Sequence, residues 1–398
     1  MQTCTVLSHK GCRVTQIIPV NNNILKWARE TSGLSIADVA KKLNKKKEII
    51  ESWEQGILTP TYPQLEKLAY EVYKRPAAVF FFPVVPEESS PKADFRTLPD
   101  EVVDSMLPEI IRIYKKAKVY QLNLKELDNK DEVKAPRLLD DFKLSNTSKL
   151  PNLAKAIRNF LKIDLQAQMA WRNLDEAFEA WRNALIVCGI YIFKDAFHND
   201  DYSGLSLYDE NYPIIKINNS MSKSRQIFSI FHELGHLLYK AGGIDVIQES
   251  YYKRFSSDYY AIEQKCNEFA GEFLFPTAVF QKDTPAFNES NLSKMADTFK
   301  VSREVVLRKY LNSKYISPNT YKSYTEKWLK EYFDIRKHKK EKKSGGDYYN
   351  TKISYLSSHY INLVFSHYYR GKIDVEALAG YLNIKVGDVQ TFEGYILR

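Results

Sequence analysis

Residues 229–238 read SIFHELGHLL, and this stretch decides both the fold and the chemistry that we expect of the chain. His232 and His236 are four residues apart, so on a helix they project from nearly the same face, one turn apart. Two imidazoles placed in this way can bind one Zn²⁺. The other residues of the stretch are mostly apolar, which predicts a buried helix whose polar side chains need partners. A shared metal ion would supply those partners.

Glu233 follows the first histidine and can face the open fourth position of a zinc site. From there a carboxylate can take a proton from a bound water and pass it to the leaving amine of a peptide. The pattern therefore predicts a zinc peptidase with Glu233 as the catalytic general base, and Mn²⁺ is the alternative metal. A surface helix that carries two histidines by chance is the competing interpretation, and the burial expected of this helix argues against it.

A second helix, predicted at Tyr260–Phe275, is expected to supply the third metal ligand. Cys266 and Ala270 belong to the apolar face of this helix. Glu263 shares that face, because it precedes them by three and seven residues. We expect Glu263 to begin the helix and to complete a His₂Glu zinc site with its carboxylate.

Several other side chains near these motifs are candidates for supporting roles. Glu268 and Glu272 are competing metal ligands, but they lie off the apolar face, where we expect them to meet solvent. Asn267 can hold a metal ligand in place through a hydrogen bond. His198 lies near the predicted strands and is a weaker candidate for the cleft. An oxyanion donor is expected among three tyrosines: Tyr202, Tyr259 and Tyr260.

Hydrophobic periodicity predicts an α+β chain that is mostly helical and has one small β-sheet. The strand candidates are Leu185–Phe193, Gly204–Tyr208 and Pro213–Ile217, and Ser222–Lys240 is the predicted metal-binding helix. The expected order is a tail at 1–20, a helix-turn-helix bundle at 21–83, a linker and helical region at 84–180, a zincin-like metallopeptidase core at 181–285, a helical extension at 286–335, a basic linker at 336–346 and a C-terminal helical domain at 347–398.

Residues 21–83 carry a helical pattern with short breaks. If residues 21–56 form a helix-turn-helix, as the family resemblance described below implies, its second helix would enter the major groove of DNA. This helix is expected to begin near Asn44 and to run to Gln55. Glu48 and Glu51 on the same helix would repel phosphates, so a protein is the alternative partner of this domain. Three cations at the start of the helix are the candidate DNA contacts: Lys45, Lys46 and Lys47.

The composition is that of a folded protein, with 44% hydrophobic and 13% aromatic residues. No apolar run approaches the roughly 20 residues that span a bilayer, and the first 20 residues do not resemble a signal peptide. The four cysteines are scattered without a C-x-x-C pair, which fits a reducing compartment. We therefore expect a cytoplasmic protein without a membrane partner. The net charge of +9 suits contact with nucleic acid but does not establish it.

Residues 373–397 near the C-terminus resemble residues 34–58 at a constant offset. Ile373–Leu397 can be laid over Leu34–Leu58, with Ala379, Asn383 and Phe392 in the places of Ala40, Asn44 and Trp53. One hypothesis is a second, degenerate helix-turn-helix unit at the C-terminus. The alternative is that two short amphipathic helices align about this well by chance. A C-terminal fold without a short turn near Asn383 would exclude the hypothesis.

The motifs resemble those of the ImmA/IrrE family of metallopeptidases. Members carry F-x-x-x-HELGH, found here at 228–236, and E-x-x-A-N-x-F-A-x-x-(L/F)-L-x-P, found here from Glu263 to Pro276. Cys266 stands in the place of the usual Ala. In that family the first Glu of the second motif is the third metal ligand, in agreement with Glu263.

The flanking segments extend this resemblance. Residues 21–56 resemble an XRE-type helix-turn-helix, and Asp94-Phe95-Arg96 and residues 345–349 resemble segments of the longer family members. The resemblance implies cleavage of a partner transcriptional repressor, which would induce stress or mobile-element genes.

A binding protein is the competing hypothesis for the function. In it, the chain is a DNA- or protein-binding regulator, or an antitoxin-like partner, with a vestigial or structural metal site. The intact Glu233 favours the enzyme, because a structural site needs no general base. In an enzyme, we expect the substrate to lie extended beside one of the short strands.

Overall fold

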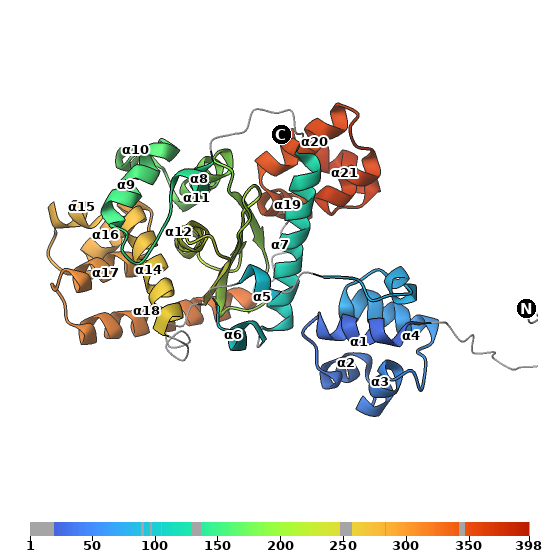
Figure 1. Cartoon of the computed structure of the whole chain (residues 1–398). Helices are drawn as coiled ribbons and strands as arrows, with labels where there is room; N and C mark the ends of the chain where they lie inside the picture. Colours follow the sequence, from blue (N-terminus) through green and yellow to red (C-terminus); the bar gives the residue numbers. More distant parts are fainter. Residues whose placement is uncertain are drawn as a thin grey trace, which may run out of the picture. The chain divides into compact units, whose positions relative to one another are not determined.

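The computed structural model describes residues 20–88, 91–95, 98–104, 106–128, 137–246, 257–282, 284–341 and 347–397 (Figure 1). The chain forms two compact units, Met1–Ser89 with Met106–Arg112, and Ser90–Ser105 with Ile113–Arg398. The predicted α+β class with mostly helical content is confirmed by the many helices and one four-stranded sheet. Within these described ranges, no helix is long and apolar enough to cross a membrane.

The first unit is a bundle of short helices around its own apolar core. Ile24, Val39 and Trp53 are among the side chains that fill this core. Ser35 caps the second helix by accepting a hydrogen bond from the backbone N–H of Asp38, whose carboxylate in turn accepts from the backbone N–H of Ser35. The elements are α1 (Asn22–Glu30), α2 (Ile36–Leu43), α3 (Lys47–Glu54), α4 (Tyr62–Glu66), η1 (Lys67–Tyr73) and η2 (Ala77–Phe81).

The turn between α2 and α3 corrects the expected start of the second helix. Asn44 ends α2 in the left-handed region, with φ 53° and ψ 51°, and Lys46 is extended, with φ −74° and ψ 150°. The helix therefore begins at Lys47 and not near Asn44, and it ends at Glu54. As a result, Lys45 and Lys46 lie in the turn, and Lys47 alone of the three lysines is on the helix.

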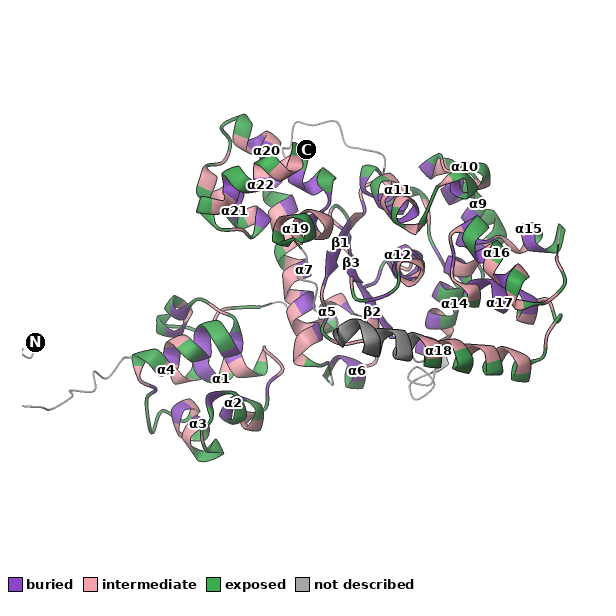
Figure 2. Cartoon of the chain, turned by 180° about the vertical axis from the view of Figure 1, so that it is seen from behind, coloured by how far each residue is buried: buried purple, intermediate pink, exposed green. Residues whose placement is uncertain are grey.

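A mixed four-stranded sheet forms the centre of the second unit, in the order β1-β3-β2-β4. Strands β1 and β3 run parallel, and β2 is antiparallel to both β3 and β4. Figure 2 shows the strands coloured as buried, and every residue of β3 and β4 is buried. The strands are β1 (Tyr191–Asp195), β2 (Tyr202–Leu207), β3 (Ile214–Asn218) and β4 (Gly243–Val246).

Helices surround this sheet and continue to both ends of the second unit. They are α5 (Pro91–Asp94), α6 (Asp100–Asp104), α7 (Pro108–Leu127), α8 (Leu138–Asp141), α9 (Leu150–Leu161), α10 (Leu165–Ala170), α11 (Leu174–Val187), α12 (Lys223–Leu238), α14 (Ser257–Leu274), α15 (Thr277–Lys282), α16 (Glu289–Phe299), α17 (Arg303–Asn312), α18 (Pro318–Glu341), α19 (Tyr348–Leu356), α20 (Ser358–Tyr369), α21 (Val375–Leu382), η3 (Val386–Asp388) and α22 (Val389–Ile396). α18 extends through the first part of the predicted basic linker, whose residues 342–346 lie outside the described residues, as does the predicted tail up to residue 19.

The predicted strand Leu185–Phe193 begins too early. α11 continues to Val187, the chain turns at Gly189 with φ 85°, and β1 begins at Tyr191. An apolar run does not by itself distinguish the end of a buried helix from a buried strand. β4 is absent from the sequence-based prediction, because four residues are too few to show an alternating pattern.

Helix α12 is the buried helix that positions the site, and it packs against α14 and strands β2, β3 and β4. Phe231 of α12 lies 5.0 Å from the Trp181 ring and 4.2 Å from the Phe273 ring, between ring centroids. Gly235 allows α12 and α14 to approach closely, because a Cβ at this position would lie 2.9 Å from the Cys266 sulfur. Small residues at this crossing therefore bring the two predicted metal-binding helices together.

The C-terminal helices α21 and α22 repeat the arrangement of α2 and α3. Asn383 ends α21 with φ 51° and ψ 52°, as Asn44 ends α2, and Asp374 caps α21 where Ser35 caps α2. α22 follows a short 3₁₀ turn, so the second helix starts later than α3 does. Five buried positions correspond at the predicted offset: Val39 and Leu378, Ala40 and Ala379, Leu43 and Leu382, Ile50 and Val389, Trp53 and Phe392. The short turn near Asn383 that the hypothesis of a second helix-turn-helix unit requires is therefore present.

Candidate metal centre

Two adjacent helices bring the predicted ligands together. His232 and His236 lie one turn apart on α12, and Glu263 lies on the facing helix α14. α14 begins at Ser257, so Glu263 lies inside the helix and does not begin it, contrary to the sequence-based expectation. All three side chains are buried, with at most 1% of Glu263 exposed.

The three side chains converge on one point. The Glu263 carboxylate lies 3.3 Å from Nε2 of His232 and 3.4 Å from Nε2 of His236, each through a different oxygen. The two Nε2 atoms are 3.2 Å apart. One ligand atom from each residue lies within 4.8 Å of the other two, and this is a cluster of the size that one cation can join.

The hydrogen bonds around the triad fit a metal ion. Asn267 Oδ1 lies 3.0 Å from Nδ1 of His232, so Nδ1 donates and the lone pair of Nε2 faces the cluster, as predicted for Asn267. Both oxygens of Glu263 and Nδ1 of His236 are buried without a hydrogen-bond partner among the described residues. Burying a carboxylate in this way is costly unless a cation compensates it. Two imidazoles and a carboxylate are a donor set that suits Zn²⁺.

The pKa shifts of the triad favour protonated, positively charged histidines beside an ionised Glu263 carboxylate. Burial lowers the pKa of His232, but the Asp245 and Glu263 carboxylates outweigh burial, so the pKa is raised. The pKa of His236 is raised well above its ordinary value, because Cys266 and Glu263 outweigh burial there. Burial raises the pKa of Glu263, but the two histidines lower it by more, so its pKa lies below the ordinary value. A divalent cation would satisfy the same charge pattern.

Glu233 lies between the two histidines on α12 and is fully buried. Its carboxylate accepts a hydrogen bond of 2.5 Å from Ser206 Oγ and one of 3.1 Å from the backbone N–H of Asp245. Burial raises the pKa of Glu233 to about 7, although His236 and His232 lower it in part. A carboxylate with a pKa near neutrality is suited to act as a general base and then as an acid.

The two competing carboxylates lie outside the cluster. Glu268 is exposed, as expected. Glu272 is buried and accepts hydrogen bonds from Lys309 Nζ at 2.8 Å and from the hydroxyl of Thr277. The expectation that Glu272 meets solvent is therefore wrong, because Lys309 of α17 supplies the charge that makes its burial possible.

The remaining predicted site residues are His198 and the three tyrosines proposed as oxyanion donors. His198 is exposed and is not part of the cluster. Tyr260 accepts a hydrogen bond from Gln264 one turn along α14, which engages its hydroxyl. Because accepting a hydrogen bond leaves its O–H able to donate, Tyr260 stays a prediction as an oxyanion donor together with Tyr202 and Tyr259. Ser206 and Asp245 were missed, because no spacing rule connects a strand serine or a residue of a four-residue strand with the HELGH helix.

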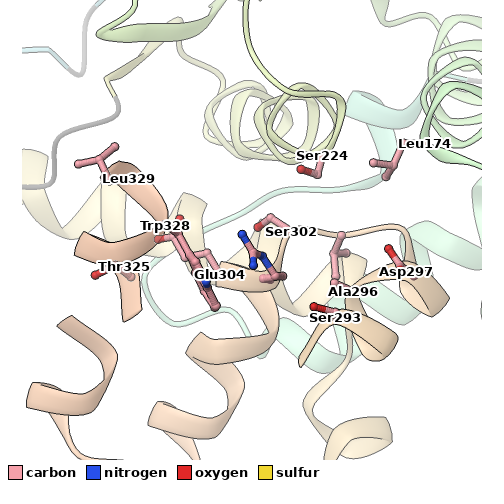
Figure 3. Close-up of a pocket in the computed structure, with 12 residues that line it drawn as sticks. Leu174, Ser224, Ser293, Ala296, Asp297, Ser302, Glu304, Thr325, Trp328 and Leu329 are labelled. Carbon is pink, nitrogen blue, oxygen red and sulfur yellow. The ribbon is translucent and has the colours of Figure 1, made fainter. Parts of the chain in front are cut away.

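A separate pocket of about 530 Å³ lies in the second unit, and Figure 3 shows the side chains that line it. Ser224 at the start of α12, Ser302 before α17 and Trp328 of α18 line it. None of the three clustered ligands contributes to its wall. The pocket therefore belongs neither to the metal cluster nor to the surroundings of Glu233.

The candidate DNA-binding lysines occupy different environments in the first unit. Lys46 and Lys47 are exposed, whereas Lys45 is half-buried with its Nζ 5.9 Å from the centre of the Trp53 ring. Glu48 beside them is exposed as well, where its charge would repel phosphates. Lys46 and Lys47 are thus available to a phosphate backbone, and Lys45 has a packing role as well.

Comparisons with known families identify two domains in the chain. Residues 187–310 match the M78 peptidase family, described as the IrrE N-terminal-like domain. Residues 25–69 match a helix-turn-helix family. Among curated proteins, nothing matches. The resemblance expected from the HELGH motif and from residues 21–56 is therefore confirmed at the level of domains, and a peptidase-type domain follows a helix-turn-helix domain in this chain.

Proposed function

We propose that this chain, which joins an M78-type peptidase domain to a helix-turn-helix domain, is a zinc-dependent endopeptidase that cleaves a partner transcriptional repressor. The observation that carries the proposal is the buried cluster of His232, His236 and Glu263 with Glu233 beside it. A structural metal site requires no general base, whereas peptide hydrolysis does. The combination therefore favours catalysis over a purely structural site.

Each residue of the cluster has a defined role in this proposal. His232, His236 and Glu263 hold the ion, with Mn²⁺ as the alternative to Zn²⁺, and Asn267 orients the His232 ring. A bound zinc ion would supply Lewis-acid activation of water and of the scissile carbonyl. Glu233 takes the proton from the attacking water and delivers it to the leaving nitrogen. In the metal-free chain, burial raises the pKa of Glu233 to about 7, so its buried environment favours uptake of a proton.

The helix-turn-helix domain supports a target among DNA-associated proteins. We propose that Lys45, Lys46 and Lys47 contribute contacts to DNA, with the exposed Lys46 and Lys47 contributing most. Such binding would keep the peptidase near a repressor on the same DNA, in the cytoplasm. Cleavage of that repressor would then induce stress or mobile-element genes.

The proposal is tested with candidate repressors, including any encoded near this chain, as substrates. Zinc-loaded wild type is compared with Glu233→Gln, which keeps the shape of the side chain but cannot act as a base. We expect wild type to cleave the repressor at one site and the variant to retain zinc but lose cleavage. Equal cleavage by both proteins would exclude Glu233 as the base.

A DNA- or protein-binding regulator is the second candidate. The repeated helix-turn-helix arrangement of α21 and α22 favours it, because two such units suit a protein whose main role is binding. In that case wild type and Glu233→Gln would bind the same DNA or protein equally, and neither would cleave any candidate repressor.

A further inference from the structure

We infer that Ser206 and Asp245 are positioning residues that hold the Glu233 carboxylate in one orientation, an inference that rests on the proposed peptidase function. Both come from strands: Ser206 from β2 and Asp245 from the edge strand β4. We call these two hydrogen bonds to Glu233 the strand clasp.

The hydroxyl of Ser206 donates its hydrogen to Glu233. Ser206 Oγ accepts a hydrogen bond of 3.1 Å from the backbone N–H of Gly243 and donates one of 2.5 Å to Glu233 Oε2. A hydroxyl has one hydrogen to donate. Because the Gly243 amide donates to Oγ and does not need this hydrogen, the O–H of Ser206 can donate to the Glu233 carboxylate. Hydrogen bonds of this kind to an ionised acceptor are shorter and stronger than neutral ones.

Asp245 supplies the other half of the clasp through its backbone. Its N–H donates to Glu233 Oε1 at 3.1 Å. Its buried carboxylate accepts from Arg225 at 2.8 Å and 2.9 Å, from Ser229 Oγ at 2.9 Å, and from Ser203 Oγ. Arg225 and Ser229 belong to α12, so the side chain of Asp245 ties β4 to the helix that carries Glu233. The position of the amide is therefore set by four hydrogen bonds that do not involve Glu233.

Close contact with β2 restricts the carboxylate further. A Cβ at Gly204 would lie 3.0 Å from Glu233 Oε1 and 3.1 Å from Glu233 Cγ, which leaves no space on that side. An ionised carboxylate has about four lone-pair positions, and the clasp uses two of them. The other two are not used by the strand clasp. The strand clasp thus orients the Glu233 carboxylate without using all of its hydrogen-bond acceptor positions, as a catalytic base requires.

The first test separates orientation from binding by measuring kcat and KM of Ser206→Ala, Ser206→Thr and Ser366→Ala. Ser366 lies on α20, and within the described part of the chain its hydroxyl donates only to Leu363 O of the same helix, so its variant controls for the loss of a hydroxyl. We expect Ser206→Ala to lower kcat about 10- to 100-fold with unchanged KM and zinc affinity. Ser206→Thr keeps the hydroxyl and restores most of kcat. Unchanged kcat in Ser206→Ala, or no recovery in Ser206→Thr, would overturn the inference.

The second test needs no activity, so it remains decisive if the chain is not a peptidase. Backbone hydrogen exchange is measured in the metal-free protein over Gly243–Val246. Ser206→Ala removes the acceptor of the Gly243 amide, and Glu233→Ala removes the acceptor of the Asp245 amide. We expect each variant to exchange its own amide at least about tenfold faster, with Ser366→Ala unchanged. Wild-type exchange in both variants would show that the clasp does not exist.

Discussion

Replacing Gly243 by alanine should destroy the metal site while leaving the fold intact. Gly243 is the first residue of β4, and a Cβ there would lie 2.3 Å from Cγ and Cδ2 of His236. Carbon atoms in contact prefer a separation of about 3.5 Å, so the strand and the ring must move apart by about 1 Å. His236 is fully buried against α14 and is also a proposed ligand, so little space exists for this movement.

The expected size of the effect follows from the tolerance of a zinc site. Ligand distances in such sites vary by only about 0.2 Å, so a displacement near 1 Å removes His236 from coordination. We expect zinc affinity to fall by more than about 100-fold, beyond the loss caused by disturbing a supporting hydrogen bond. Overpacking of this kind should also lower the free energy of unfolding by about 1–3 kcal/mol. Chelator competition measures the first quantity and urea denaturation of the metal-free protein the second.

Gly271→Ala is the matched control for this variant. Gly271 lies on α14, and a Cβ there would meet nothing within 4 Å. Alanine in a helix is favoured over glycine, so this variant should bind zinc normally and gain about 0.5–1 kcal/mol of stability. Stoichiometric zinc binding with wild-type affinity by Gly243→Ala would refute the reasoning, because β4 would then not lie against His236.

Three further predictions concern the surroundings of the site. Lys309→Met leaves the buried Glu272 without its cation and should destabilise the chain by about 3–5 kcal/mol in urea denaturation. Adding Glu272→Gln to this variant should recover part of the loss. If the double variant instead loses the sum of the two single losses, the ion pair is not the cause. Burial raises the pKa of Asp245, but Arg225 and neighbouring groups lower it from 3.8 to about 2. Because the pKa of Asp245 is lower in the folded than in the unfolded chain, its ionised carboxylate contributes about 2 kcal/mol to the free energy of unfolding above pH 4, and this contribution is lost as the pH falls towards 2. When the free energy of unfolding is measured against pH in this range, its decrease should be less steep in Asp245→Asn than in wild type. An equal slope in the two proteins would argue against the ion pair with Arg225. Asn267→Ala should weaken zinc binding about 10- to 100-fold, with the exposed Glu268→Ala as the control, and equal affinities in the two variants would remove Asn267 from the site.

The cluster of candidate metal ligands was predictable because its information is local. His232 and His236 are related by one helical turn, and Glu263 follows from its place on the apolar face of the next helix. The second helix-turn-helix arrangement was also visible, because the buried positions of α21 and α22 keep the spacing of α2 and α3.

The surroundings of Glu233 were not predictable from local patterns. Ser206 and Asp245 reach this carboxylate because β2 and β4 pair over α12, and that pairing depends on tertiary contacts. Glu272 was expected at the surface, since its partner Lys309 comes from α17, 37 residues later. The strand at Leu185–Phe193 was placed too early for a related reason: burial on all sides removes the period that distinguishes a helix from a strand.

The most direct test of the central claim is X-ray absorption spectroscopy of the zinc-loaded chain, compared with Glu263→Gln. We predict one zinc per chain in wild type, with two imidazole nitrogens at about 2.0–2.1 Å and a carboxylate oxygen, and a marked loss of affinity in the variant. A spectrum without imidazole ligands, or zinc held equally well after His232→Ala and His236→Ala, would contradict the account.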